Sequence, residues 1–489
     1  MSSVIKRLAG QTAVYGLSNI LGRLLNYLLV PLHTYMFSQA QYGTVTEFYA
    51  YSSFLFVLYT YGMETAFFRF SNTDNKDEVR NASMLSLLIS TCILSLILFV
   101  ASSPIASALG YENKAYYIRW FALIMAADTL CVIPFANLRL KNKPLRYAVI
   151  RLLNIGITIT LNLYFLTYSV GSSQVFGEVV NNSIEGYVFL ANLVASIITF
   201  LFFLPDYFNV SFTVNRTLIK SMWRYSWPLI FIGMAGMINE TLDRILLKNL
   251  LPFSDEENLA QTGIYGACYK LSILMTLFIQ AYRMAAEPFF FNESKNKDAP
   301  EIYARTMSVF IAICAFIYIG IIINLDFIKH FIDDKFHEGL VIVPVLLAAN
   351  MCLGIYYNLS VWYKLTNKTL VGAWIALFGA LITLALNIWW IPAFGYIGSA
   401  WATLVCYVSM MICSFWAGQY FFPVPYRIGR AIAYVIGMLV ICYAHQKIMS
   451  LASLPMLFSV IVNVLIIGGL GYIIYQLEIK KPLAFNANK

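Results

Sequence analysis

Five cationic side chains lie inside long apolar runs of this sequence, where a charge is costly: Arg23, Arg151, Arg244, Lys270 and Arg283. Charged groups at membrane depth are rare, and those that occur usually face a bundle interior or a water-filled cavity. Each of the five is therefore a candidate for binding a substrate or forming a gate.

Carboxylates share these runs. Asp128 lies near the middle of one run, where an ionised carboxylate must be paired or else become protonated. Asp128 either couples transport to a gradient of H+ or Na+, or is a neutral acid hydrogen-bonded to a neighbouring helix. Four more acidic residues lie closer to the ends of runs: Glu47, Glu64, Asp243 and Glu287.

The apolar runs define the fold class. Of 489 residues, 60% are hydrophobic and 12% charged, against roughly 25% charged in soluble domains. Runs of about 20 residues, enough to cross the bilayer core as helix, lie at 8–30, 43–66, 82–103, 115–137, 147–168, 186–204, 222–248, 262–286, 304–324, 340–361, 370–391, 397–420, 431–449 and 455–477. The alternation typical of barrel strands is absent. We predict an all-α polytopic membrane protein with about 14 transmembrane helices.

Charge predicts the orientation. The net charge is +9, but the basic residues are spread among short loops, so we expect no nucleic-acid partner. If the N-terminus is inside, 22 of the 33 Lys and Arg residues fall in inner segments and 6 in outer ones, Lys248 among the outer six. This excess predicts that both termini are cytoplasmic. Lys6 and Arg7 precede the first run and no cleavage site follows it, so we interpret this run as a retained span.

The eight cysteines contain no CxxC pair and have no histidine at ligand spacing. We therefore expect neither a disulfide framework nor a metal site. No cofactor is predicted, and H+ or Na+ is the only candidate coupling ion.

The sequence repeats itself. A shift of 223 residues aligns Tyr42-Gly43 with Tyr265-Gly266 and Glu64 with Glu287, and a shift of 221 aligns Arg23 with Arg244. A shift of 225 aligns three further features with their counterparts: Asn142-Lys143 with Asn367-Lys368, Thr158 with Thr383, and Asn162 with Asn387. The punctuating polar residues are difficult to match by chance, so helices 1 to 6 and 7 to 12 are predicted to be two copies of one unit.

Each copy has an even number of helices, so an axis along the membrane normal relates the two copies. We predict an N-lobe at 1–220, a C-lobe at 221–425, and helices 13 and 14 with a cytoplasmic tail at 426–489. Two such lobes enclose a central cleft that opens to either side by rocking. This geometry is typical of alternating access.

Several segments resemble polysaccharide exporters of the multidrug/oligosaccharidyl-lipid/polysaccharide (MOP) flippase superfamily. They are SNILGRLLNYLLVPLHTYMFSQAQYG (18–43), RLKNKP (139–144), WPLIFIGMAGMINETLDRILLKNLL (227–251), YKLTNKTL (363–370) and NIWWIPAFGYIGSAWAT (387–403). Fourteen helices are typical of the oligosaccharide-lipid branch, with its Wzx-like flippases and MurJ, whereas drug-exporting relatives usually have twelve. The MurJ pattern has Asp after the helix 1 arginine, but Leu24 follows Arg23 here.

The resemblance implies a flippase that moves an undecaprenyl-diphosphate-linked oligosaccharide across a bacterial plasma membrane, for O-antigen, capsule or similar polysaccharide. Its expected partners are the lipid-linked oligosaccharide, membrane lipids, a polysaccharide polymerase and glycosyltransferases. A lipid II flippase like MurJ and a cation-coupled drug exporter of the MATE type remain alternatives. An enzyme is not expected, because no GxSxG motif or large extramembrane loop is present.

Within this frame, Arg23, Lys270 and Arg151 are predicted to bind the diphosphate. Glu47 is expected to hold Arg23 and Lys270 as an outer gate when substrate is absent. The alternatives are an inert buried ion-pair network, or side chains that reach the head groups.

Glu64, Arg69, Arg283 and Glu287 are candidates for an inner gate or for interfacial residues. Asp243 and Arg244, with Glu240, permit the same two interpretations, or simple pairing with each other. The basic loop containing Arg139, Lys141, Lys143 and Arg146 is interpreted as positive-inside charge that contacts anionic lipids. Its alternative is to attract the anionic head group, which Arg151 then receives.

Overall fold

The computed structural model describes residues 16, 18, 20–72, 74–169, 183–211, 215–294, 296–452 and 456–480. Every regular element within these ranges is a helix. The start of the first predicted span, with Lys6 and Arg7, lies outside the described residues, as do Lys295, Lys481 and Lys489.

Packing divides the chain into two compact units, Met1–Gly266 and Ala267–Lys489. This division falls inside α11 (Asp255–Leu271) and not at the expected lobe boundary after residue 220. The two units are defined by packing between residues, whereas the lobes were predicted from the internal sequence repeat. The predicted lobe boundary therefore stays a prediction.

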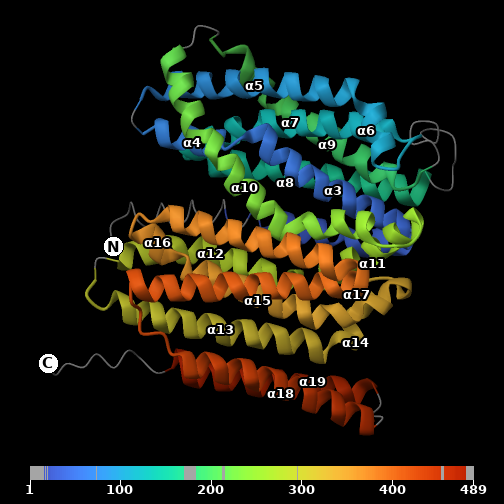
Figure 1. Ribbon diagram of the computed structural model, residues 1–489, viewed down its shortest axis with the longest axis vertical. Helices are drawn as coiled ribbons and strands as arrows, with labels where there is room; N and C mark the ends of the chain where they lie inside the picture. Colours follow the sequence, from blue (N-terminus) through green and yellow to red (C-terminus); the bar gives the residue numbers. More distant parts are fainter. Residues whose placement is uncertain are drawn as a thin grey trace. The chain divides into compact units, whose positions relative to one another are not determined.

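Unit 1 begins with a helical stretch at 20–27 and continues through nine helices before α11. They are α2 (Leu29–Met36), α3 (Gln39–Thr60), α4 (Met63–Phe70), α5 (Lys76–Val100), α6 (Ser102–Ala108), α7 (Ala115–Leu140), α8 (Pro144–Tyr164), α9 (Gly186–Phe208) and α10 (Arg216–Leu250). Helix α7 packs against α5 and α9, and these helices run alongside one another (Figure 1). The arrangement buries most of α7, including the side chain of Thr129.

Local sequence signals set several helix starts in unit 1. Ser38 and Gln41 form a capping box before α3: the Ser38 hydroxyl accepts a hydrogen bond from the Gln41 N–H, and the Gln41 side chain accepts one from the Ser38 N–H. Asn75 and Asn215 cap α5 and α10 through their side-chain oxygens. These caps satisfy backbone donors that the helix itself leaves unpaired.

Unit 2 contains the rest of α11 and eight further α-helices. They are α12 (Ile273–Glu293), α13 (Ala299–Ile323), α14 (Leu325–Ile328), α15 (Val343–Leu359), α16 (Val361–Leu365), α17 (Thr369–Phe421), α18 (Ile428–Ala452) and α19 (Met456–Ile474). Helix α13 packs against α15, α18 and α19, and the last two lie along it in Figure 1.

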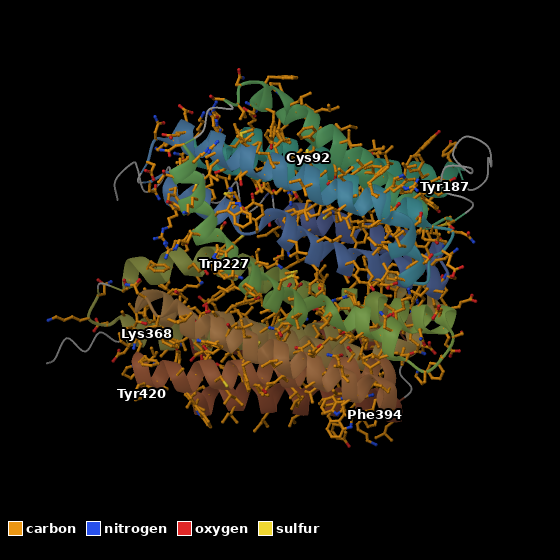
Figure 2. The ribbon with its side chains drawn as sticks, turned by 45° about the horizontal axis from the view of Figure 1, so that its top comes forward. Cys92, Tyr187, Trp227, Lys368, Phe394 and Tyr420 are labelled. Atoms are coloured by element: carbon orange, nitrogen blue, oxygen red, sulfur yellow. The ribbon has the colours of Figure 1, made fainter. Side chains whose placement is uncertain are left out.

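Helix α17 is a hairpin of two helices. Gly395 interrupts it with φ 60° and ψ −144°, three residues after Pro392. In Figure 2, Lys368 and Tyr420 lie at one end of unit 2 and Phe394 at the opposite end, so the chain reverses near Gly395. Only glycine adopts such a backbone easily. The break falls between the two predicted spans 370–391 and 397–420.

Apolar side chains cover much of the outer surface. Leu451, Leu465 and Val100 are 83%, 69% and 75% exposed, and Figure 2 shows side chains projecting along both units. Among the described residues, nine helices are long and apolar enough to span a membrane, or ten if the bent pair α11 and α12 forms one span. Lipid solvates such a surface well, whereas water does not, and the protein is a multi-pass membrane protein. The count of fourteen and the orientation stay predictions.

Candidate functional site

Two intramembrane arginines of unit 1 influence each other. Arg23 lies in the helical stretch 20–27 and Arg151 on α8, and both side chains are exposed in the structure. Arg23 interacts electrostatically with Arg151 and with Glu240 of α10. Two guanidinium groups within electrostatic range repel each other, and this repulsion favours a negative charge beside them.

Asp128 of α7 belongs to a polar group within unit 1. Its carboxyl is hydrogen-bonded to Ser196 of α9 and interacts electrostatically with Arg151. The Ser196 hydroxyl donates to the Asn192 side chain at 3.3 Å, and Asn192 donates to the Tyr49 hydroxyl at 3.0 Å. The structure therefore gives Asp128 a hydrogen bond to a neighbouring helix, and its coupling role stays a prediction.

Helix α8 carries a polar stripe that continues from Arg151. Asn154, Thr158 and Asn162 follow at spacings of three and four residues, which places them on one face. Asn154 donates to the Thr199 hydroxyl of α9 at 2.8 Å, and the side-chain oxygen Oδ1 of Asn162 lies 2.9 Å from His33 Nε2. The stripe is therefore tied to both neighbouring helices.

Glu47 of α3 is fully buried and is held by residues that the sequence did not indicate. The Tyr111 hydroxyl donates to Glu47 at 2.6 Å, and Lys248 Nζ lies 3.4 Å from the carboxylate. Lys248 also donates to the Leu109 carbonyl and lies 4.1 Å from the centre of the Tyr111 ring. Burial raises the pKa of Tyr111 well above its ordinary value, so its hydroxyl stays a donor.

Sequence reasoning missed Lys248 because it counted this residue among the outer-loop cations. Helix α10 continues to Leu250 and so includes Lys248, which is only 6% exposed. One signal was present: Lys248 follows Arg244 by four residues and lies on the same helical face.

Asp243 and Arg244 pair with each other at 3.1 Å, as one of the predicted alternatives had it. The Tyr265 hydroxyl of α11 donates to the other oxygen of Asp243 at 2.5 Å. Arg244 also donates to the carbonyl of Glu240. Asp243 is therefore a buried acceptor that joins α10 to α11.

Glycines bring α3 and α11 into backbone contact within unit 1. A Cβ added at Gly43 would lie 1.9 Å from the Leu259 carbonyl oxygen, and one added at Gly263 would lie 2.0 Å from that of Gln39. No larger residue fits at either position without separating the helices. This crossing lies near the start of α3, one turn before Glu47.

The two predicted inner-gate carboxylates each pair with a cation that was not predicted to belong to the gate. Glu64 of α4 pairs with Arg139, and Glu287 of α12 pairs with Lys364 and lies 3.5 Å from Arg283. The shifts that align Glu64 with Glu287 and Arg139 with Lys364 differ by only two residues. Each pair therefore links equivalent helices of its own copy.

Two of the predicted inner-gate cations lie over aromatic rings. Arg69 stacks over the Tyr225 ring at 4.2 Å, and Arg283 over the Tyr357 ring at 4.6 Å. Lys270, in the last turn of α11, has an exposed side chain and belongs to unit 2. Its predicted meeting with Arg23 and Glu47 stays a prediction. No group of three metal-ligating side chains occurs in the part of the chain that the structure describes.

Comparison with known proteins identifies a family and a fold for this chain. Residues 8–293 match the model of a family described as polysaccharide biosynthesis protein. No curated protein matches the sequence. Among solved structures, the lipid II flippase MurJ in an inward closed conformation has a TM-score of 0.69 at 15% identity, over 94% of this chain and 98% of MurJ.

Two MATE transporters also share the fold. An inward-facing multidrug resistance MATE transporter of the MOP superfamily has a TM-score of 0.60 at 13% identity, over 88% of this chain and 99% of its own. A Vibrio cholerae MATE transporter in the bent form has a TM-score of 0.53 at 12% identity, over 90% and 99%. The chain therefore belongs to the polysaccharide biosynthesis protein family and has the fold of MurJ and the MATE transporters.

Proposed function

We propose that this protein is an alternating-access flippase. It moves an undecaprenyl-diphosphate-linked oligosaccharide from the inner to the outer leaflet of a bacterial plasma membrane, for synthesis of a surface polysaccharide such as O-antigen or capsule. Membership of the polysaccharide biosynthesis protein family supports the pathway. The fold, which is that of transporters and flippases, supports transport over catalysis.

The observation that carries the proposal is the pair Arg23 and Arg151. Both cations are exposed, influence each other, and lie within apolar helical stretches of unit 1. A diphosphate brings at least two negative charges, which a guanidinium pair binds with charge-assisted hydrogen bonds. Glu240 and Asp128 serve as counter-charges when no substrate is present.

Asp128 supplies a coupling site under this proposal. Its hydrogen bond to Ser196 and its interaction with Arg151 place an acid beside a substrate-binding cation. H+ or Na+ is the ion that would bind there. Replacement of Asp128 by Asn should remove the dependence of export on the ion gradient, whereas a retained dependence would exclude the coupling function.

Complementation tests the substrate. A bacterial strain that lacks its oligosaccharide flippase would receive the wild type, Arg23→Gln, Arg151→Gln or, as a control, Arg216→Gln, whose exposed side chain lies at the start of α10. We expect surface polysaccharide from the wild type and the control only, at equal expression.

Two other outcomes identify the alternatives. Resistance to cationic drugs without surface polysaccharide would indicate a drug exporter of the MATE type. Rescue of cells depleted of MurJ would indicate lipid II as the substrate. Co-purification with a polysaccharide polymerase or a glycosyltransferase would test the proposed partners.

A further inference from the structure

The turn between α7 and α8 and the turn before α17 have the same backbone. Asn142 and Asn367 both adopt the left-handed conformation, with φ 52° and 57°. The N–H of Lys143 donates to the Leu138 carbonyl at 2.9 Å, and that of Lys368 donates to the Tyr363 carbonyl at 2.7 Å. Both turns are therefore Schellman motifs at equivalent positions of the repeat.

The first cation of each turn is neutralised in the same way. Glu64 pairs with Arg139, and Glu287 pairs with Lys364. In the second turn, the remaining cation Lys368 lies 3.4 Å from the centre of the Phe421 ring. The second turn therefore carries a single further cation, which is exposed and contacts an aromatic ring of its own unit.

The first turn carries an excess of cations. Lys141, Lys143 and Arg146 are exposed and form no ion pair with any residue that the structure describes. The repeat places Thr366 and Val371 where Lys141 and Arg146 occur. The positive-inside rule explains why inner loops carry cations. It does not explain why the first turn has more cations than the second. Helix stability does not explain Arg146 either, because this residue lies in the first turn of α8 and the start of a helix favours anionic side chains.

A further cation, Arg151, lies deeper in the membrane on the helix that follows the first turn. Arg151 lies five residues after Arg146 on α8, a rise of about 7.5 Å. Arg151 in turn interacts with Arg23. The second copy has Ala376 at the position of Arg151. Only the first copy therefore has a series of cations from the turn to the intramembrane arginine pair.

We propose that Lys141, Lys143 and Arg146 capture the diphosphate head group of the lipid substrate in the inner leaflet and deliver it to Arg151. This inference rests on the proposed function. It specifies that the substrate first binds at the turn between α7 and α8, in the first copy of the repeat. Lysine ammonium groups attract phosphate as point charges, and arginine binds it through two parallel hydrogen bonds. The equivalent turn of the second copy does not take part.

A binding experiment on the full chain tests the capture site. The protein is placed in nanodiscs of uncharged lipid, and the probe is radiolabelled farnesyl diphosphate, with farnesol as the uncharged control. The variant Lys141→Gln/Lys143→Gln/Arg146→Gln is compared with Arg216→Gln/Lys220→Gln/Arg224→Gln. The second variant removes three exposed cations from the start of α10, which is also predicted to be cytoplasmic.

We expect the turn variant to raise the Kd for farnesyl diphosphate about tenfold or more at low salt, since each cation near the membrane surface contributes to anion attraction. The control variant should change the Kd less than about twofold. The difference should shrink in high salt because exposed charges are screened. In a flipping assay, the turn variant should raise the half-saturating substrate concentration and leave the maximal rate unchanged.

Four results would overturn the inference. Equal Kd changes in the two triple variants would show that the cations of the turn act only as ordinary positive-inside charge. Equal competition by phosphatidylglycerol, at matched charge, would make it a surface for anionic lipids in general. An unchanged Kd in the turn variant, with binding lost in Arg151→Gln, would refute capture but leave the proposed function standing. If the wild type does not bind the probe, both proposals fail.

Discussion

The first half of α17 and helix α8 are equivalent helices of the two copies, and they share some polar residues but not others. Asn162 and Asn387 are both fully buried and donate to Thr158 and Thr383, one turn earlier, at 2.8 and 2.7 Å. Both helices also follow the same left-handed turn. These shared residues donate hydrogen bonds to backbone carbonyls or adopt the left-handed conformation of a turn. Each copy therefore needs them to fold.

The residues that differ bear on function. Helix α8 has Arg151 and Asn154 where α17 has Ala376 and Gly379. A second difference is at the end of the copies predicted to be outer, where buried Glu47 is equivalent to the exposed Lys270. The second copy folds with Ala376 at the position of Arg151, so the fold of this helix does not itself require a cation there.

The largest effect is expected at Glu47. Glu47→Gln leaves Lys248 buried without its counter-charge, and we expect the free energy of unfolding to fall by about 3 kcal/mol. The exposed counterpart variant Lys270→Gln should cost less than about 1 kcal/mol. Denaturant unfolding in mixed micelles, followed by circular dichroism, measures both. Equal costs would contradict the difference in burial between the two copies.

Arg151→Ala converts the first copy to the residue of the second copy. We expect the efficiency of flipping, kcat/KM, to fall about 100-fold, because a cation that binds the substrate anion is removed. A reconstituted flipping assay with a diphosphate-linked lipid measures the loss. Leu153→Ala, an exposed apolar neighbour on α8, should stay within about twofold. Full activity in Arg151→Ala would show that the asymmetry between copies has no role in transport.

The two left-handed asparagines should respond alike. Asn142→Ala and Asn367→Ala each place a Cβ-bearing residue without a polar side chain at positive φ, at a cost of about 1 kcal/mol. Asn→Gly at either position should be tolerated, because glycine adopts this conformation without strain. Thermal unfolding of the four variants provides the comparison. A marked difference between the copies would mean that the turns are not structurally equivalent.

The smallest effect is expected at the repeated ion pairs. Glu64 and Glu287 have side chains that are 39% and 38% exposed, so Glu→Gln at either should cost at most about 1 kcal/mol. The cost should diminish from low to high salt in both variants. Unfolding measured at two ionic strengths tests this expectation. A larger, salt-independent cost at one site would assign that pair a gating role that its counterpart lacks.

Sequence alone was sufficient for much of the architecture. Run length and composition identify membrane helices, because lipid requires long apolar segments with internally satisfied backbone groups. Pro392 and Gly395 mark the reversal within α17, since their backbone preferences are local. The polar residues that punctuate the apolar runs indicate the repeat, and Asn142 and Asn367 adopt matching conformations in the structure.

Only the tertiary structure decided which charges meet. Lys248 lies about 200 residues from Glu47 in sequence, yet it approaches the carboxylate within 3.4 Å. Glu64 pairs with Arg139 of its own unit, which no local pattern indicates. Spacing along a helix specifies which residues share a face. Which neighbouring helix that face contacts depends on the packing of the whole unit. This packing determines the partners of Glu47, Glu64 and Arg151.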